Sequence, residues 1–375
     1  MEQKKDVGIL TYHTGYNYGA SLQAYALMIT IKKMGFSCEI INFETERFLA
    51  SREMFSRKPT RLKEVIKIAS RLPYYGDLKE RQRLFDSYTN EYLDISPLYR
   101  SEQEVIAHST EYKCIVCGSD QIWNLSQNDS PAANPLFFLN FPKTQRRISY
   151  AASFGIWVKD ASDKEDVFLP WLKQFDSISV RETSGVEYVK SLGLDCKLCL
   201  DPTLLLDAQD YDHICVERLI PEKYVLLFSW MCTEDVIQAA KLVGKELKLP
   251  VYNIVPPPRA MFKGIKRKLD VGPSEFLSMI KYAEFVVTNS FHGAAFSITF
   301  EKPYVSIVTG KADLRMKSLL EQLGLKKHLV SNKNLNINEL MKIDYSAVRE
   351  KKISLRKDSL DYLKNALAGL KDDQF

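Results

Sequence analysis

Short apolar runs alternate with amphipathic helical patterns along most of the chain, and this alternation limits the fold more than any other feature. The first example is the apolar run 7–11, followed by a loop, a helical pattern over 20–34 and a second apolar run at 38–42. Gly35 suits the end of that helix. Strand, loop, helix and strand in this order form a βαβ unit, whose two strands lie parallel in one sheet. The sequence therefore predicts an α/β protein.

The same rhythm predicts two Rossmann-like domains. We expect an N-terminal domain over 1–206 and a C-terminal domain over 222–342. Residues 47–100 are charged and helical in period, so we expect them to form a helical insertion over one edge of the first sheet. The strands of the first domain are expected at 114–117, 147–151 and 177–180, with a helix at 182–192. The second domain is expected to have strands at 224–228, 251–254, 285–288 and 304–308 and helices at 233–247, 273–283 and 290–300.

The two domains are expected to face a cleft near residues 207–222. Ligands of open α/β sheets bind beyond the carboxyl ends of the strands. The tail 343–375 has a long helical pattern and can pack back on the first domain.

Composition and charge exclude several classes of protein. The net charge of +5 does not favour nucleic-acid binding. The basic patches 52–71 and 263–268 are either solvated faces or contacts for an anionic membrane or substrate. Residues 1–6 are charged, no apolar signal core follows, and the apolar runs are far shorter than the roughly 20 residues of a membrane span. We therefore expect a cytoplasmic protein, with the inner face of the membrane as a possible contact of its basic patches.

The seven cysteines do not indicate a metal site. Cys114 and Cys117, like Cys196 and Cys199, lie in strand-like segments, where side chains three apart point to opposite faces. No common metal or nucleotide motif is present, so we expect neither a metal nor a bound cofactor.

The strongest local motif is the segment 288–294, where a strand is followed directly by a helix. Asn289 or Ser290 can cap the helix, whose first-turn amides then suit a phosphate or carboxylate. His292 lies in that first turn and can donate to a phosphate or exchange a proton. Gly293 permits close approach of a ligand or of neighbouring backbone. The alternative is a structural histidine at a helix start.

Three further motifs follow predicted strands of the first domain. The loop 12–19 carries His13, Asn17 and Tyr18, and it is either a binding loop or a structural turn. Arg181 suits a carboxylate or phosphate, or an ion pair inside the protein. The third motif is polar and aromatic, which suits a sugar, unless its tryptophan belongs to the core. It comprises Ser119, Asp120, Gln121 and Trp123.

Several short motifs in a fixed order resemble those of the polysaccharide pyruvyl transferase family over residues 7–310. They are 15–19 with 22–27, 118–124, 149–155, 179–182, 201–203 and 289–293. The resemblance implies a GT-B-like arrangement of the two domains. It implies phosphoenolpyruvate as co-substrate and, as acceptor, a sugar of a capsule, exopolysaccharide or cell-wall precursor, including a lipid-linked oligosaccharide.

The resemblance also implies roles for individual residues. His292 corresponds to the catalytic histidine of the family, and Arg181 to its strand-end arginine. Ser290 stands where the family has an arginine, and we expect Lys302 or a lysine of 263–268 to replace that cation. The donor site is then formed by Arg181, Asn289, Ser290, Gly293 and Lys302. The acceptor site is formed by His13, Asn17, Tyr18, Ser119, Asp120, Gln121 and Trp123.

The implied reaction is the transfer of the enolpyruvyl group onto a sugar as a pyruvate ketal, with release of phosphate. Two other functions stay open on the sequence alone. One is a sugar-nucleotide glycosyltransferase of the same architecture, and the other is a non-catalytic carbohydrate-binding protein.

Overall fold

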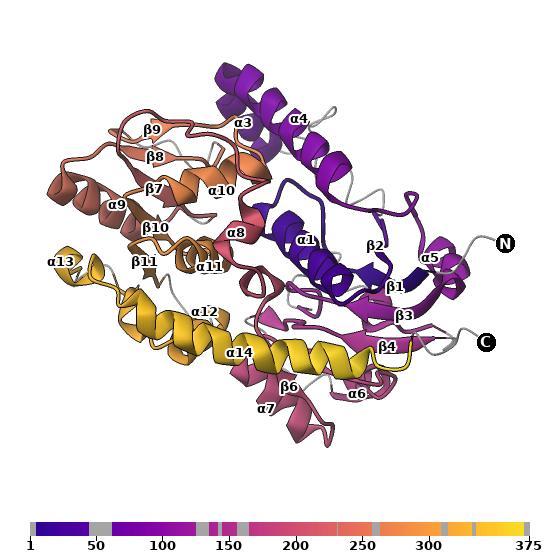
Figure 1. The fold of residues 1–375 in the computed structure, drawn as a ribbon. Coiled ribbons are helices and arrows are strands. Elements are labelled where there is room, and N and C mark those ends of the chain that lie inside the picture. The colour runs from indigo at the N-terminus through magenta and orange to yellow at the C-terminus, as the bar shows by residue number, and fades with distance from the viewer. Residues whose placement is uncertain are drawn as a thin grey trace. The chain divides into compact units, whose positions relative to one another are not determined.

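The chain divides into two compact units in the computed structural model (Figure 1). Unit 1 consists of Met1–Ser51, Tyr92–Leu206 and Lys351–Phe375, and unit 2 consists of Arg52–Glu91 and Asp207–Glu350. The structure describes residues 5–44, 62–124, 135–141, 145–155, 165–230, 232–256, 263–308, 314–331 and 335–370.

Unit 1 is built on a parallel sheet of strand order β2-β1-β3-β4. Ile9 of the central strand lies opposite Ile40 on one side and Val116 on the other. A parallel bridge from Ala152 to Val180 continues the sheet from β4 to β5, which pairs with β6. The strands are β1 (Lys5–Leu10), β2 (Cys38–Ile40), β3 (Tyr112–Cys117), β4 (Arg146–Ser149), β5 (Ser179–Val180) and β6 (Lys197–Leu198). The helices are α1 (Tyr18–Lys33), α5 (Glu102–His108), α6 (Glu165–Leu172) and α7 (Thr183–Ser191).

Helix α1 begins where the sequence provides a cap. The side chain of Asn17 accepts a hydrogen bond from the backbone N–H of Gly19 at 3.0 Å, which satisfies a first-turn donor. The helix is buried along most of its length, because its apolar side chains, Leu22 and Leu27 among them, belong to the core.

Unit 2 is built on a parallel sheet of six strands in the order β12-β11-β10-β7-β8-β9. Strand β10 is central, since Thr288 at its end pairs with Ser306 of β11 and with Phe228 of β7. The strands are β7 (Val225–Phe228), β8 (Val251–Asn253), β9 (Lys266–Arg267), β10 (Phe285–Thr288), β11 (Tyr304–Ile307) and β12 (Leu329–Val330). The helices are α8 (Ala208–Tyr211), α9 (Glu234–Leu247), α10 (Pro273–Lys281), α11 (Phe291–Thr299), α12 (Leu314–Gln322) and α13 (Ile337–Leu340).

The helical insertion differs from the sequence prediction in the unit to which it belongs. Its helices are α3 (Leu62–Arg71) and α4 (Tyr75–Tyr92), and residues 52–91 form part of unit 2 rather than of the first domain. The buried guanidinium of Arg81 donates to the backbone carbonyl of Ile254 at 3.1 Å. Arg267 donates to the hydroxyl of Tyr74 at 2.7 Å. These partners are distant in sequence, which is why chain order alone placed the insertion on the wrong sheet.

The last helix, α14 (Tyr345–Ala366), begins in unit 2 and continues into unit 1. Within unit 1 the buried hydroxyl of Ser359 accepts from the backbone N–H of Leu200 at 2.9 Å, and Leu363 is fully buried. From Lys351 onward the tail is therefore a structural part of unit 1, whereas its first residues belong to unit 2. In the described part of the chain, no helix is long and apolar enough to cross a bilayer.

Candidate active site

The junction of β10 and α11 lies at the carboxyl edge of the unit 2 sheet and is organised by Thr288. Its hydroxyl donates to the backbone carbonyl of Phe228 at 2.6 Å and accepts from the backbone N–H of Ser290 at 2.9 Å. Ser290 is the N-cap of α11, and its hydroxyl accepts from the N–H of Gly293 at 3.4 Å. The capping role that the sequence assigned to Ser290 is therefore present, and the first turn of α11 starts at the end of the central strand.

His292 is the second residue of α11 and keeps only 8 % of its surface exposed. Its ring meets the ring of Phe291 edge-on, with 5.3 Å between the ring centroids. Asn289 and Ser290, just before it, are half-buried. A histidine in the first turn of a helix after a parallel strand stands where ligands of α/β sheets bind.

Gly293 is required by the packing of α11 against the sheet. A Cβ atom at this position would lie 2.4 Å from the hydroxyl oxygen of Thr288 and 3.0 Å from the ring of Phe228. No side chain fits at this position unless the helix shifts. Glycine at 293 therefore allows the first turn of α11 to lie close to β10 and β7.

The structure does not bring Lys302 together with His292. Lys302 follows α11 and precedes β11, and its carbonyl accepts from the hydroxyl of Tyr345 at 2.6 Å. Because Val286 of β10 pairs with Tyr304, Lys302 lies at the amino edge of the sheet. The length of α11, about 13 Å, separates the two edges. The prediction of Lys302 as a donor ligand was wrong. Lys302 and His292 are close in sequence, but α11 lies between them and places them at opposite ends of the helix.

Arg315 is a cation at the correct edge, and the sequence analysis missed it. It lies in the first turn of α12 and is nearly buried. The position of Arg315 follows from its neighbour Met316. The Met316 sulfur lies 3.6 Å from the hydroxyl of Ser306, near the carboxyl end of β11. Ser306 in turn pairs with Thr288. An arginine in the first turn after the next strand was the available signal.

Two buried polar residues on neighbouring strand ends were also missed. Ser229 directly follows β7, and Asn253 is the last residue of β8. Both are fully buried, and among the described residues no hydrogen-bond partner is found for the Ser229 hydroxyl or the Asn253 Oδ1 atom. A polar residue closing an apolar strand was the signal in both cases.

Arg181 is the centre of a buried ionic network in unit 1. Its two Nη atoms donate to Asp201 at 2.5 Å and to Asp120 at 3.0 Å. Burial alone would lower the pKa of Arg181, but the carboxylates of Asp201 and Asp120 raise it above its ordinary value. The side chain is 1 % exposed, so the ion-pair alternative describes Arg181, and the role of donor ligand is not supported.

The same network engages Ser119 and Gln23. The Ser119 hydroxyl lies 3.1 Å from Asp201 Oδ2 and 2.8 Å from the carbonyl of Ala151, and its N–H donates to the side-chain oxygen of Gln23 at 3.1 Å. Ser119 is therefore structural. Asp120 keeps a small exposed surface, and its φ of +65° is a conformation that non-glycine residues adopt rarely and often at functional sites.

Other predicted acceptor residues belong to the core or to caps. Trp123 is fully buried, stacks on Phe138 and donates from Nε1 to the carbonyl of Phe137 at 3.0 Å. Tyr18 is fully buried in α1, so neither ring is available to a sugar. Both rings pack in the hydrophobic core because burying their large apolar surface is favourable. The structural alternative therefore holds for Tyr18 and for Trp123.

His13 and Asn17 have internal partners as well. His13 is buried, with Nδ1 3.1 Å from the carbonyl of Thr11 and Nε2 3.0 Å from Asn42 Oδ1. Asn17 is engaged in the cap of α1. Asp120 and the half-buried Gln121 have internal partners too, but both keep some polar surface exposed, so they are the predicted acceptor residues that the acceptor site can still use. Gln121 accepts from the Asn124 side chain at 2.8 Å.

The four cysteines of the two closely spaced pairs behave as core residues. Cys114, Cys117, Cys196 and Cys199 are buried free thiols, and burial raises the pKa of Cys196 and of Cys199 to about 12. In the described ranges, no group of three potential metal ligands is close enough to hold an ion.

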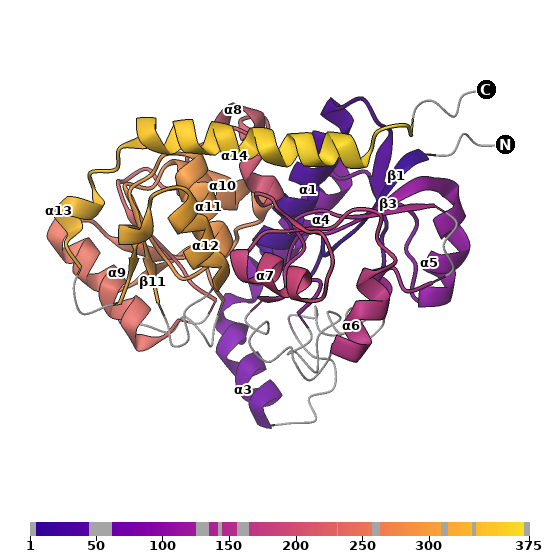
Figure 2. The ribbon, with the colours of Figure 1, turned by 90° about the horizontal axis from the view of Figure 1, so that it is seen from below.

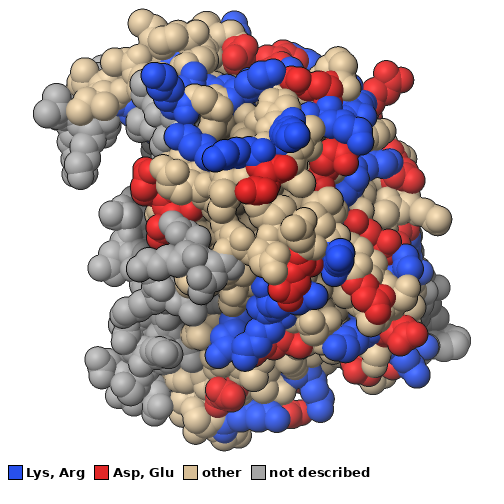
Figure 3. Space-filling model, turned by 90° about the vertical axis from the view of Figure 1, so that its left-hand side faces the viewer, with Lys and Arg blue, Asp and Glu red and all other residues tan. Residues whose placement is uncertain are grey.

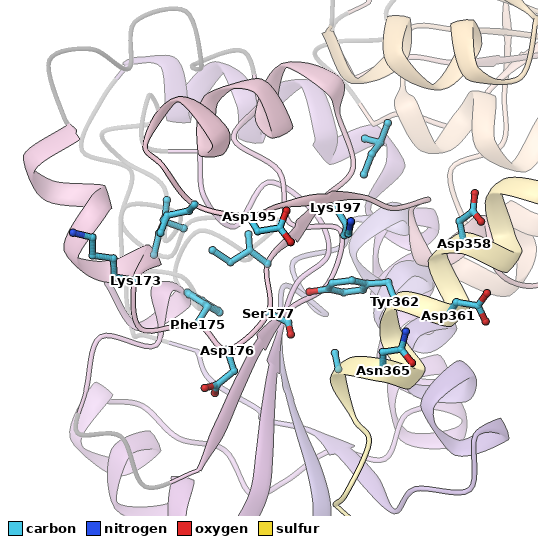
Figure 4. Close-up of a pocket in the computed structure, with 15 residues that line it drawn as sticks. Lys173, Phe175, Asp176, Ser177, Asp195, Lys197, Asp358, Asp361, Tyr362 and Asn365 are labelled. Atoms are coloured by element: carbon cyan, nitrogen blue, oxygen red, sulfur yellow. The ribbon is translucent and has the colours of Figure 1, made fainter.

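A cavity of about 800 Å³ lies in unit 1, between the β5–β6 pair and α14 (Figure 4). Asp176 and Ser177 precede β5, so the cavity opens at the amino edge of the sheet, away from Arg181. Its lining carries four aspartates and two lysines. That balance disfavours a doubly negative ligand such as phosphoenolpyruvate.

Comparison with known proteins decides the family. The model of the polysaccharide pyruvyl transferase family matches residues 17–310, which is most of the chain. The chain belongs to the polysaccharide pyruvyl transferase family. The match includes both the Arg181 network and the β10–α11 junction, so the resemblance predicted from the sequence is confirmed. No curated protein sequence matches the chain significantly.

Solved structures show the fold. The MnaA protein of S. aureus, determined with UDP, is 12% identical, with a TM-score of 0.50 over 97% of this chain and 97% of that one. The UDP-GlcNAc 2-epimerase from Methanocaldococcus jannaschii is also 12% identical, with a TM-score of 0.45 over 92% of each chain. At this identity the likeness concerns the fold alone. The likeness to the S. aureus structure confirms the predicted α/β class with two Rossmann-like units, the GT-B-like fold of this family member.

Proposed function

We propose that this protein transfers the enolpyruvyl group of phosphoenolpyruvate onto a sugar of a polysaccharide precursor, as a pyruvate ketal, with release of phosphate. The family match carries the proposal. The position of His292 in the first turn of α11, at the end of the central strand, supports it. We place the reaction in the cytoplasm, on a precursor of a capsule, exopolysaccharide or cell-wall polymer.

The donor site of this proposal lies at the carboxyl edge of unit 2. Phosphoenolpyruvate has a phosphate and a carboxylate, and it needs backbone amides and a cation. The first turn of α11 supplies amides and the positive end of a helix dipole. Arg315 supplies the guanidinium that Ser290 cannot provide, and its fork suits either anionic group.

In this proposal His292 is the general acid. A protonated imidazole delivers a proton to the methylene carbon of the donor, which becomes the methyl group and leaves an oxocarbenium-like carbon. A sugar hydroxyl attacks that carbon, and a second hydroxyl of the same sugar then displaces phosphate. Of the two hydroxyl protons, one leaves with the phosphate and the other reprotonates the imidazole. Fixed positive charge beside the phosphate stabilises this transition state.

The acceptor residues of this proposal are Asp120 and Gln121 at the carboxyl edge of unit 1. A carboxylate and a carboxamide are suitable partners for sugar hydroxyls. Arg181 does not touch substrate here, and it positions Asp120 by holding its carboxylate at 3.0 Å.

The test uses the full chain with phosphoenolpyruvate and a panel of lipid-linked and free oligosaccharides. We expect phosphate release only when an acceptor is present, and a product whose mass increases by one pyruvate less one water. Calorimetry with sugar nucleotides is the parallel arm. Binding of a nucleoside diphosphate sugar without binding of phosphoenolpyruvate would replace the proposal with glycosyl transfer, and binding of sugar without turnover would make the protein a carbohydrate-binding one.

A further inference from the structure

Helix α3, the turn after it and the first residue of α4 present an exposed apolar stripe. Val65, Ile66, Leu72 and Tyr75 are 47%, 52%, 63% and 51% exposed. They are half of the eight large apolar side chains that are exposed in the described ranges of the chain, although they lie within eleven residues. Val65, Ala69 and Leu72 follow the i, i+4, i+7 spacing of one helix face. Figure 2 shows α3 at the outer edge of the ribbon.

Basic residues lie near this stripe. Lys67 and Arg71 are on α3 itself, on the half-buried side away from Val65 and Leu72. Arg267 of β9 is joined to the turn after α3, because its guanidinium lies 5.4 Å over the ring of Tyr74 and donates to its hydroxyl. In sequence, 263–268 contains four basic residues and no acidic one.

The surface view agrees with this arrangement. In Figure 3 a largely uncharged protrusion lies at the upper left, where Figures 1 and 2 place α3, and Lys and Arg side chains, with Asp and Glu among them, lie beside it. Apolar side chains that project from a convex helix, with cations beside them, match the two layers of an anionic membrane surface. The apolar groups enter the acyl boundary while the cations meet lipid phosphates.

We propose that α3 docks unit 2 onto a bilayer containing anionic lipid. The docking surface consists of Val65, Ile66, Leu72 and Tyr75, with Arg267 of the basic segment 263–268 beside it. The reaction proposed above gives this surface a purpose, since it would hold the enzyme at a lipid-linked acceptor. Lipid binding itself depends only on the surface.

The test is sedimentation of the full chain with vesicles. We expect binding to vesicles of phosphatidylcholine mixed with phosphatidylglycerol, little binding to phosphatidylcholine alone, and weaker binding as salt is raised. The double variant Val65→Ser/Leu72→Ser should bind at least 10-fold more weakly. Ile353→Ser is the matched control, because Ile353 is 65% exposed on another helix, and its affinity should not change.

Three outcomes would overturn the docking proposal. They are no sedimentation of the wild type with anionic vesicles at low salt, equal losses in the double variant and the control, and loss of self-association by the double variant in place of loss of lipid binding. Unfolding midpoints of all variants should match the wild type, since the replaced side chains are exposed. Turnover of a water-soluble acceptor should be unchanged in the double variant. Failure of that turnover in every protein, with lipid binding intact, would contradict the proposed reaction and leave the docking surface standing.

Discussion

The hydroxyl of Thr288 donates to the backbone carbonyl of Phe228 at 2.6 Å, and this bond joins the ends of two neighbouring strands, β10 and β7. The same oxygen accepts the N–H of Ser290, so the start of α11 is fixed relative to the sheet. These two bonds fix the base on which His292 stands, as the proton transfer proposed for it requires.

Gly293→Ala should disturb that base. The added methyl group would lie 2.4 Å from the Thr288 hydroxyl, so α11 must shift, and we expect a loss of about 1–3 kcal/mol in the free energy of unfolding. Urea denaturation measures the loss, and turnover should fall with it. Gly76→Ala is the matched control, because in the described part of the chain a Cβ placed there meets no atom within 4 Å beyond its chain neighbours and its own helix backbone, and the change should not destabilise the protein. Equal stability of the two variants would contradict the packing role of Gly293.

His292→Gln should reduce phosphate release by about 100-fold or more, because loss of a general acid costs that much in many enzymes. Binding of phosphoenolpyruvate by calorimetry should fall far less. His108→Gln is the control, since this histidine is exposed, with Glu111 as its partner. Normal turnover in His292→Gln would remove this residue from the mechanism.

Arg315→Ala should raise the KM for phosphoenolpyruvate about 10-fold or more, and Arg315→Lys should recover part of the loss because it restores the charge without the bidentate fork. Initial-rate measurements at several phosphoenolpyruvate concentrations give the KM of each variant. Lys302→Ala serves as the comparison, because its side chain begins at the amino edge of the sheet and its KM should equal that of the wild type. The reverse pattern would assign the donor cation to Lys302.

Arg181→Met should destabilise unit 1 by about 3–5 kcal/mol, because it leaves the carboxylates of Asp120 and Asp201 buried without their cation. Asn in place of Asp201 in the same chain should restore part of the stability. Arg83→Met removes an exposed ion pair with Glu80 and should leave the unfolding midpoint unchanged. A fully stable Arg181→Met protein that no longer binds phosphoenolpyruvate would favour the donor role instead.

His328 should make stability depend on pH. Burial lowers its pKa below the ordinary 6.5, and in the described part of the chain its Nε2 atom has no hydrogen-bond partner. The unfolded chain therefore takes up a proton first, and stability should fall as pH decreases below about 6.5, by at most about 1.4 kcal/mol per pH unit. His328→Gln should flatten this slope in urea denaturation between pH 7 and pH 5. An unchanged slope would mean that His328 is not responsible.

The sequence predicted local structure well where the signal was local. Strand β10 has the predicted bounds, and Ser290 caps α11 as expected. The choice among partners was not local. Arg181 could meet a substrate or a carboxylate, and only the fold shows Asp120 and Asp201 beside it. Trp123 suited a sugar equally well before Phe138 was found stacked on it. Arg315 belongs to no recognised motif. Its place at the carboxyl edge follows only from the way β11 is followed by α12, so the sequence analysis did not single it out.

Unit 1 is assembled from three separate stretches of chain, and the last of these is Lys351–Phe375. Its Lys352 donates to the carbonyl of Leu206, and its Leu363 and Leu367 are fully buried. A growing polypeptide thus cannot complete this half until the ribosome has passed Leu367, even though β1 emerges first. Until then the unfinished core is exposed to chaperones and proteases, and a stop codon near residue 350 should cost the cell this half of the molecule while the other half has all its segments.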